Sequence, residues 1–461
     1  MPANSDENFE VRFESGTVFI DGDLVQKLTL RVDRMLRGLQ ETQDSRSLDL
    51  MCIAAGCYAL DRTVKRQNSP ANERGIRKLR VCFAVLDWQY WNSAEAANRI
   101  TEILVFLTGD NWLISFKRQA AAMRPAQAIF NLDWQSPPRR VALYSGGLDS
   151  AAGLASRFRD GVTEYLLLTI GHQSAIRRDS FSQVKSLQNL FPNQGSVAHA
   201  SLVVRLKGGV SRRLSDQEQS QRARGFLFLA AAAVVANASR IEEIEIFENG
   251  AGSINLPLME GMLCDGLATR GAHPGFLAKM SSLASDSLGA KIRFVLPFSG
   301  MTKAEMIRML TDDPRVTRWT LSSRSCVHTS LRKPNVRHCG TCPACIERRQ
   351  AFIAAGVSED PGVYFEDIFN VAAPLQNHYL RCYIDNARAW INGDVGVAER
   401  LKRHLILTDI KDDDGQIHQL MHRHAQEVNN VFEKLAYEQI PKAEKFQTFS
   451  ASPSQSMSAL L

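Results

Sequence analysis

The sequence contains no apolar run long enough to cross a membrane. Its longest uninterrupted apolar stretch, from Phe226 to Ala236, is about half of what a bilayer-spanning helix needs. The amino-terminal residues MPANSDENFE are acidic and polar, so we expect no secretion signal. No charge of one sign dominates, because 55 Lys and Arg residues against 49 Asp and Glu residues leave a net charge of +6. This balance permits a nucleotide, nucleic acid or acidic protein as a ligand and requires none of them. We therefore expect a cytoplasmic protein.

The composition excludes disordered, collagen-like and coiled-coil proteins. Of the 461 residues, 44% are hydrophobic and 23% are charged, which is ordinary for a globular protein. Three of the nine cysteines, Cys339, Cys342 and Cys345, fall within seven residues, and such clustering indicates metal binding rather than a disulfide framework. At roughly 150 residues per domain, the length suggests about three domains, or one large domain with extensions.

Apolar patterns divide the chain into an α/β region, a middle region of alternating strands and helices, and a helical region. We predict boundaries at 1–137, 138–356 and 357–449, followed by a disordered tail at 450–461. In the first region the patterns predict strands at 17–20, 79–86 and 111–116 and helices at 48–65 and 93–107.

The middle region alternates short apolar strands with helical patterns. The predicted strands are 141–144, 165–170, 201–206 and 243–247, and the predicted helices are 151–158, 181–190 and 222–238. This alternation implies right-handed crossovers and a parallel sheet with helices on both faces. The last region is predicted to be helical at 375–392, 397–407 and 417–438.

The sharpest local motif is VALYSGGLDSAAGLASRF, residues 141–158, in which a strand turns directly into a helix. Gly146 and Gly147 let the backbone approach an anion closely and adopt positive φ. Ser145, Ser150 and the amides of the helix N-terminus supply hydrogen-bond donors, aided by the helix dipole. The pattern therefore predicts a phosphate-binding loop.

Asp149, within the same motif, is a poor phosphate ligand by itself and is suited to hold Mg²⁺ beside the phosphates. The motif is not a Walker A loop, because the lysine is absent and the spacing differs. A glycine-rich strand-to-helix turn that binds no ligand is the alternative interpretation.

The second motif is SCVHTSLRKPNVRHCGTCPACIERRQAF, residues 325–352. Two residues separate each neighbouring pair among Cys339, Cys342 and Cys345, and twelve residues separate Cys326 from this group. Four thiolates fill the tetrahedral shell of a structural Zn²⁺ site, and redox or iron–sulfur chemistry is the competing interpretation. The basic residues that partly offset the charge of this site, and that are candidates to face a nucleotide, are Arg337, Arg348 and Arg349.

Together the two motifs resemble the 7-cyano-7-deazaguanine synthase (QueC) family. SGGLDS resembles the PP-loop of the ATP pyrophosphatases, and the cysteine cluster with its Arg-Arg-x-Ala-Phe run follows about 180 residues later. Four segments between the motifs also resemble the family: Gly171-His172-Gln173, RARGFLFL at 222–229, Phe247-Glu248-Asn249-Gly250 at a strand end, and PFSGMTKAEMI at 297–307. The last of these resembles a short proline-led strand that precedes a helix. The resemblance covers about 140–356.

The resemblance implies a Rossmann-like, adenine nucleotide α-hydrolase type of core that uses ATP and Mg²⁺ to adenylate the carboxylate of a 7-deazaguanine. The residues that it assigns to the phosphates and Mg²⁺ are Ser145, Gly146, Gly147, Leu148, Asp149 and Ser150. Adenine is expected against the backbone near Leu168 and Thr169. The candidates to contact a substrate carboxylate or a phosphate are Arg222, Arg224 and Lys303, and an exposed basic helix start is the alternative for the two arginines.

Family members that make the queuosine precursor are shorter and lack counterparts of 1–137 and of the helices after Val357. Extended chains of this kind resemble components of bacterial anti-phage operons, notably the QatC type of the Qat system. This resemblance implies a protein partner from the same operon, and it requires no nucleic acid and no membrane. An aromatic-rich stripe from Leu375 to Trp390 would either anchor that partner or pack the helices onto the core.

Two other functions are compatible with the motifs. A tRNA-modifying PP-loop enzyme would use redox-active cysteines and a basic surface that follows phosphates. An ATP-responsive scaffold without catalysis would keep the nucleotide fold, although the intact SGGLDS motif argues against a decayed site.

Overall fold

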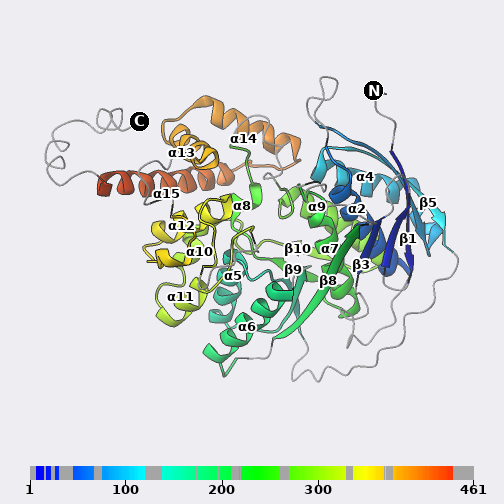
Figure 1. Cartoon of the computed structure of the whole chain (residues 1–461), viewed down its shortest axis with the longest axis horizontal. Helices are drawn as coiled ribbons and strands as arrows, with labels where there is room; N and C mark the ends of the chain where they lie inside the picture. Colours follow the sequence, from blue (N-terminus) through cyan, green and yellow to red (C-terminus); the bar gives the residue numbers. More distant parts are fainter. Residues whose placement is uncertain are drawn as a thin grey trace.

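A ten-stranded sheet runs through the protein, with helices on both faces (Figure 1). The computed structural model describes residues 7–14, 17–21, 26–30, 45–66, 75–119, 138–171, 174–194, 197–208, 218, 220–258, 269–328, 336–367, 369 and 377–439. The strand order is β10-β9-β6-β7-β8-β3-β2-β1-β4-β5. In chain order the strands are β1 (Glu7–Glu14), β2 (Thr17–Asp21), β3 (Gln26–Leu30), β4 (Lys78–Val85), β5 (Asn111–Arg118), β6 (Arg140–Leu143), β7 (Tyr165–Gly171), β8 (Ala198–Gly208), β9 (Glu243–Ile246) and β10 (Arg293–Val295).

The middle region forms a parallel half-sheet, as the strand–helix alternation predicts. β10, β9, β6, β7 and β8 pair in parallel, and β7 is fully buried over its first five residues because both of its faces are covered. One face is covered by α5 (Leu148–Arg159), α6 (Ser174–Leu190) and α11 (Pro314–Leu321). The other face is covered by α7 (Arg224–Ala238) and α9 (Pro274–Leu288). The predicted α/β fold class is confirmed.

The amino-terminal strands extend the same sheet. β3 pairs with β8 in the antiparallel direction, β1 pairs in parallel with β4, and β4 pairs in parallel with β5. The helices of this region are α2 (Ser45–Thr63), α3 (Trp88–Trp91) and α4 (Ala94–Thr108), and Ser93 caps α4 as predicted. One apolar core joins α2 and α4 to α7 and α9, so the first region shares its interior with the middle one. The expected domain boundaries stay predictions.

The carboxyl-terminal helices pack onto one another and also onto the middle region. They are α13 (His378–Ile391), α14 (Val395–Leu407) and α15 (Gln416–Gln439), close to the predicted ranges. Their apolar core includes residues of α8 (Gly250–Ile254) and α12 (Pro343–Ala354). Leu380, Tyr383 and Trp390 are buried in it, so these members of the aromatic stripe pack inside the chain and do not form an exposed interface.

The segment before α10 (Lys303–Arg308) differs from the expectation of a proline-led strand. β10 ends at Val295, and Pro297 is followed by turns up to the Thr302 N-cap of α10. Proline has no amide hydrogen for the sheet ladder, which fits its place after the strand. A short 3₁₀ helix, Pro361–Val363, follows α12.

Some predictions lie outside the described residues: the tail at 450–461, His172, Gln173 and Leu375. Among the residues that the structure does describe, none of the helices has the length and apolarity required to cross a membrane.

Candidate functional site

A tight turn joins the end of β6 to the start of α5. Gly146 has a φ of +74°, the left-handed region in which glycine is favoured. A Cβ atom at Gly146 would lie 2.9 Å from the Oγ of Ser180 on α6, so the packing of the turn also favours glycine. Gly147 is the N-cap of α5 and offers no side-chain cap to the first helical amides. These amides and the helix dipole therefore favour an anion at this end of α5.

Two serines shape the turn. The Oγ of Ser145 accepts a hydrogen bond from the amide of Gly147 at 3.1 Å and lies 3.0 Å from the Oγ of Ser150. Ser145 is exposed and Ser150 is buried. The Leu148 side chain is buried in a small apolar cluster with Phe352, so this residue offers only its backbone to a ligand. All the residues predicted for the phosphate loop thus surround one turn.

A cavity of about 440 Å³ opens beside this turn. Five of its eleven lining residues are serines, and two arginines, Arg324 and Arg337, outnumber the single carboxylate of Asp179, which suits an anionic ligand. The amide of Arg324 donates to the carbonyl of Gly146 at 2.9 Å, so the segment that leads to Cys326 lies directly against the loop. Arg337 donates to the carbonyl of Ser322 at 3.0 Å and forms part of the same wall.

The other two arginines expected near a nucleotide have structural partners. Arg348 is completely buried and pairs with Glu359 at 2.7 Å. Arg349 pairs with Asp367 at 2.8 Å. These contacts join α12 to the segment that follows it, because both partners are acidic residues after Gly356.

Asp149 lies in a cluster of charged side chains next to the turn. Its Oδ2 is 3.1 Å from the Nζ of Lys303, and its Oδ1 accepts from the Nδ2 of Asn249 at 2.9 Å. The same Nδ2 donates to Glu248 at 2.8 Å, and Lys303 lies 3.4 Å from the Oε2 of Glu347. The structure therefore brings together Asp149 and Lys303, which sequence reasoning assigned to the site from separate segments.

The charges of this cluster do not balance, because three carboxyl groups surround one ammonium group. Burial, and then the charge of Asp149, raise the pKa of Glu248 to about 8. Burial alone would lower the pKa of Lys303, but the carboxylates of Asp149, Glu347 and Glu248 raise it above its usual value. At neutral pH Lys303 is therefore an ammonium ion, and most Glu248 is protonated.

Thr169 is completely buried at the carboxyl end of β7. Its Oγ1 donates to the carbonyl of Tyr144 at 2.6 Å and lies 2.8 Å from the Nε2 of His199. The side chain thus has protein partners, and any contact of adenine with Thr169 would use its backbone, as the resemblance implies.

Arg222 and Arg224 flank the start of α7, and the contacts of Arg222 reach the amino-terminal region. The Nη1 of Arg222 donates to the carbonyl of Thr108 at 3.1 Å, and this side chain is buried. Arg224 is exposed, and its guanidinium lies 5.6 Å from the ring centre of Phe228. Their assignment to a substrate carboxylate stays a prediction.

The four predicted metal ligands converge. The sulfur atoms of Cys326, Cys339, Cys342 and Cys345 lie within 4.8 Å of one another, and all four residues are buried. The sulfurs of Cys339 and Cys345 are 3.8 Å apart, and a tetrahedral shell with Zn–S bonds of about 2.3 Å requires about 3.8 Å. Backbone amides of Cys339 and Cys342 donate to neighbouring sulfurs at 3.4 and 3.3 Å, as expected for thiolates. The donor set fits a closed Zn²⁺ site.

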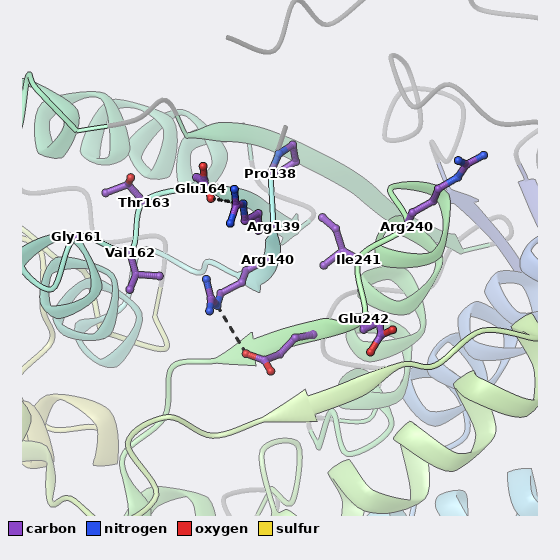
Figure 2. A pocket seen from close by; sticks show the side chains of 11 residues that line it. Pro138, Arg139, Arg140, Gly161, Val162, Thr163, Glu164, Arg240, Ile241 and Glu242 are labelled. Carbon is purple, nitrogen blue, oxygen red and sulfur yellow. Dashed lines mark ion pairs between the residues drawn. The ribbon is translucent and has the colours of Figure 1, made fainter. Parts of the chain in front are cut away.

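A larger hollow of about 760 Å³ lies at the opposite edge of the sheet (Figure 2). It is formed around the amino ends of β6, β7 and β9, whereas ligands of open α/β sheets bind at the carboxyl ends of the strands. Four of its six charged side chains pair with one another: Arg139 lies 2.7 Å from Glu164, and Arg140 lies 3.7 Å from Glu243. We therefore do not assign this hollow to the active site.

Sequence reasoning did not assign Glu248, Asn249, Glu347 or Tyr379 to the site. Glu248 and Asn249 were placed at a strand end, where an open α/β sheet binds its ligands, but were given no role. Glu347 lies within the Cys-x-x-Arg-Arg run at 345–349 as one acidic residue beside two basic ones. The hydroxyl of Tyr379 on α13 donates to Glu347 Oε1 at 2.6 Å. No local signal could have connected this helix to a loop more than 200 residues earlier in the chain.

Comparisons with known proteins find similarity to QueC proteins over part of the chain. A family model described as "Queuosine biosynthesis protein QueC" matches residues 271–356, which hold α9 to α12 and the cysteine cluster. A 7-cyano-7-deazaguanine synthase of Rhizobium meliloti (strain 1021) is 33% identical over 105 residues, which are 22% of this chain and 40% of that protein. The enzyme of the same name from Anaeromyxobacter sp. (strain Fw109-5) is 27% identical over 246 residues, 50% of this chain and 97% of that protein. The chain therefore spans about two fifths of the Rhizobium relative.

Proposed function

We propose that this chain is a QueC-like, ATP-dependent enzyme that activates the carboxylate of a 7-deazaguanine and transfers the acyl group to a nitrogen nucleophile. The observation that carries the proposal is the phosphate-loop turn at the carboxyl end of β6 with the Asp149–Lys303 pair beside it. The similarity of residues 271–356 to QueC proteins supports the same chemistry.

The reaction has two balanced steps. A carboxylate oxygen attacks the α-phosphorus of ATP, and pyrophosphate leaves. The nitrogen nucleophile then attacks the carbonyl carbon, AMP leaves, and the nitrogen loses a proton to a base. The ionised fraction of Glu248 suits the role of base, because a group with a pKa of about 8 is present in both protonation states near neutral pH.

The residues of the turn would bind the phosphates through the amides at the start of α5. Lys303 would neutralise charge on the departing pyrophosphate, since it is the ammonium group adjacent to the turn. Mg²⁺ would be held by Asp149, and when bound it would add positive charge to the phosphate oxygens. Arg324 and Arg337 line the cavity from the side of the cysteine cluster, where a second anionic group would fit.

The test is calorimetric titration with Mg-ATP, followed by measurement of pyrophosphate release with 7-carboxy-7-deazaguanine. Gly147→Val should abolish binding, because a Cβ atom at this position already lies 3.1 Å from Ser145 Oγ and a branched side chain would fill the space of the phosphates. Asp312→Ala is the control, because it removes an exposed carboxylate paired with Arg159 in the last turn of α5. Wild-type affinity in Gly147→Val would refute the assignment of the loop.

We further propose that the acceptor nitrogen belongs to a protein from the same operon, in a system for defence against phage. Three of the most exposed large apolar side chains among the described residues, Val395, Ile406 and Leu407, lie on α14 and offer a contact surface. Mass spectrometry of the complex purified from the native host should find a deazaguanine-sized adduct on the partner. Ile406→Asp should reduce the recovery of the partner, and an unmodified partner would leave ammonia as the acceptor.

A further inference from the structure

The carboxyl-terminal helices cover the elements that present the charged cluster. α15 packs against α12, which carries Glu347, and against α8, which begins next to Asn249 (Figure 1). α13 packs mainly against α15 and also contacts α12. The helices after residue 376 therefore lie next to the proposed active site, although they have no counterpart in the sequence motifs that identify it.

A continuous series of contacts leads from α13 to the phosphate loop. The hydroxyl of Tyr379 donates to Glu347 Oε1 at 2.6 Å, and the other oxygen, Oε2, lies 3.4 Å from Lys303 Nζ. Lys303 Nζ is in turn 3.1 Å from Asp149 Oδ2. The ring of Tyr379 is stacked on that of Tyr383, with centres 5.9 Å apart, which fixes the hydroxyl toward Glu347.

α15 also holds the start of α10, which carries Lys303. Arg423 pairs with Glu305 at 2.9 Å and donates to the carbonyl of Gly300 at 2.7 Å. Glu305 is the acidic member of the capping box that starts α10, since it accepts from the amide of Thr302 at 2.8 Å. α15 thus contacts the turn on both sides of the Thr302 N-cap.

The same helix lies tightly against the start of α8. A Cβ atom at Gly250 would lie 2.5 Å from the Leu420 side chain of α15 and 1.9 Å from the carbonyl oxygen of Ser299. Gly250 follows Asn249, whose side chain bridges Asp149 and Glu248. The positions of Asn249 and Lys303, on opposite sides of Asp149, both depend on packing against α15.

We infer that Tyr379 is a positioning residue for the proposed reaction: its hydroxyl fixes Glu347, and Glu347 holds Lys303 against Asp149 at the phosphate loop. The carboxyl-terminal helices are therefore part of the active site and not only a surface for partners. This inference rests on the proposed function, because Lys303 needs a defined position only if it meets a developing charge.

The experiment uses the full chain with Tyr379→Phe, which removes the hydroxyl and keeps the stacked ring. We expect the rate of pyrophosphate release to fall about 10-fold, since one hydrogen bond to a charged group is lost, while the KM for Mg-ATP changes less. Glu347→Gln should lower the rate similarly, and the double variant should be no slower than the slower single variant, because both changes remove one linkage. Additive losses would indicate two unrelated structural effects and would overturn the inference.

The control is Tyr90→Phe, which removes a hydroxyl that donates to the carboxylate of Asp286 at 2.7 Å, between α3 and α9. It should leave the rate unchanged. A second measurement does not depend on catalysis. It records the rate at which an amine-reactive ester acylates Lys303 in the absence of nucleotide. Release of Glu347 should raise this rate in Tyr379→Phe and not in Tyr90→Phe.

The two measurements separate the inference from the proposed function. A wild-type chain that neither binds Mg-ATP nor releases pyrophosphate would refute the proposed function, and the acylation rate would still decide whether Tyr379 controls Lys303. Equal acylation of Lys303 in wild type and Tyr379→Phe would overturn the inference, whatever the result with ATP.

Discussion

Two groups of buried or partly buried charges differ in balance: one lies beside the turn at the carboxyl end of β6, and the other lies at the amino ends of β4 and β5. In the amino-terminal region, Arg66 and Arg77 face Asp61 and Asp110: Arg77 lies 2.6 Å from Asp61, and Arg66 lies 2.6 Å from Asp110. Arg66 also lies 3.9 Å from Glu218, whose carbonyl accepts from Arg62 at 2.7 Å, so the cluster continues with one more side chain of each sign and stays balanced. Beside the phosphate loop, three carboxyl groups surround Lys303, and the contacts found among the described residues bring no second cation into this cluster. We call these the balanced and the unbalanced cluster.

The difference assigns each cluster a role. A balanced cluster that is fully hydrogen-bonded needs nothing further, and this one anchors α7, because Asp61 Oδ2 accepts from the amide of Ala223 at 2.8 Å. The unbalanced cluster keeps a surplus of negative charge, which is costly when it is buried. Its stability improves when a cation or a proton enters, and the raised pKa of Glu248 is one expression of this surplus. The surplus of negative charge therefore favours a cation at this cluster, as the proposed function requires.

The cysteine cluster, with four potential thiolates, is the extreme case of unbalanced charge. Substitution of one of its cysteines should therefore cause the largest loss of stability. Cys342→Ser removes one of four converging ligands, and because metal affinity contributes to folding, we expect a loss of several kcal/mol in the free energy of unfolding. Elemental analysis should find one zinc per wild-type chain. Iron in place of zinc, or full thermal stability after chelation, would contradict this prediction.

The balanced cluster should matter for stability and not for nucleotide binding. Asp110→Asn removes the carboxylate that Arg66 and Arg77 share and leaves Asp61 as the remaining carboxylate partner of Arg77 among the described residues, and we expect a loss of about 3–5 kcal/mol in denaturant unfolding, since both arginines are more than nine-tenths buried. In the matched variant Asp149→Asn, removal of one surplus charge should cost little stability but should weaken Mg-ATP binding at least 10-fold. If Asp149→Asn were the more destabilising of the two, the contrast between the clusters would be wrong.

Much of this architecture could be predicted because its signals are contiguous in the sequence. The phosphate loop is one strand–turn–helix segment, and three of the four cysteines fall within seven residues. Strands β6, β7 and β9 are short apolar runs between helical patterns, so their ranges were predicted to within about two residues.

The parts that could not be predicted depend on distant contacts. β3 became a strand through pairing with β8, in which Leu28 faces Leu206 across a long separation in sequence. The Tyr379–Glu347 contact likewise joins residues that are far apart in the sequence. Aromatic residues at helical spacing are equally compatible with an interface and with a core, and only the packing of α13 onto α12 distinguished the two.

The last prediction concerns Glu248 and the pH dependence of stability. Its pKa is about 8 in the folded chain, against about 4.5 when unfolded, so the folded state binds more protons between these values. The free energy of unfolding should therefore fall as pH rises from about 4.5 to about 8.

Glu248→Gln tests this prediction, because glutamine keeps an oxygen that can accept from Asn249 and cannot ionise. Denaturant midpoints measured at pH 5, 6, 7 and 8 should decline less steeply in this variant than in wild type, and at pH 8 the variant should be the more stable of the two. Glu433→Gln, a change at an exposed position on α15, is the control and should follow wild type. If the midpoints of Glu248→Gln and wild type declined in parallel with pH, Glu248 would not be the group that holds a proton in the folded state near neutral pH. The unbalanced cluster would then have to be neutralised at another carboxyl group, and Glu347, the second acidic partner of Lys303, is the next one to substitute.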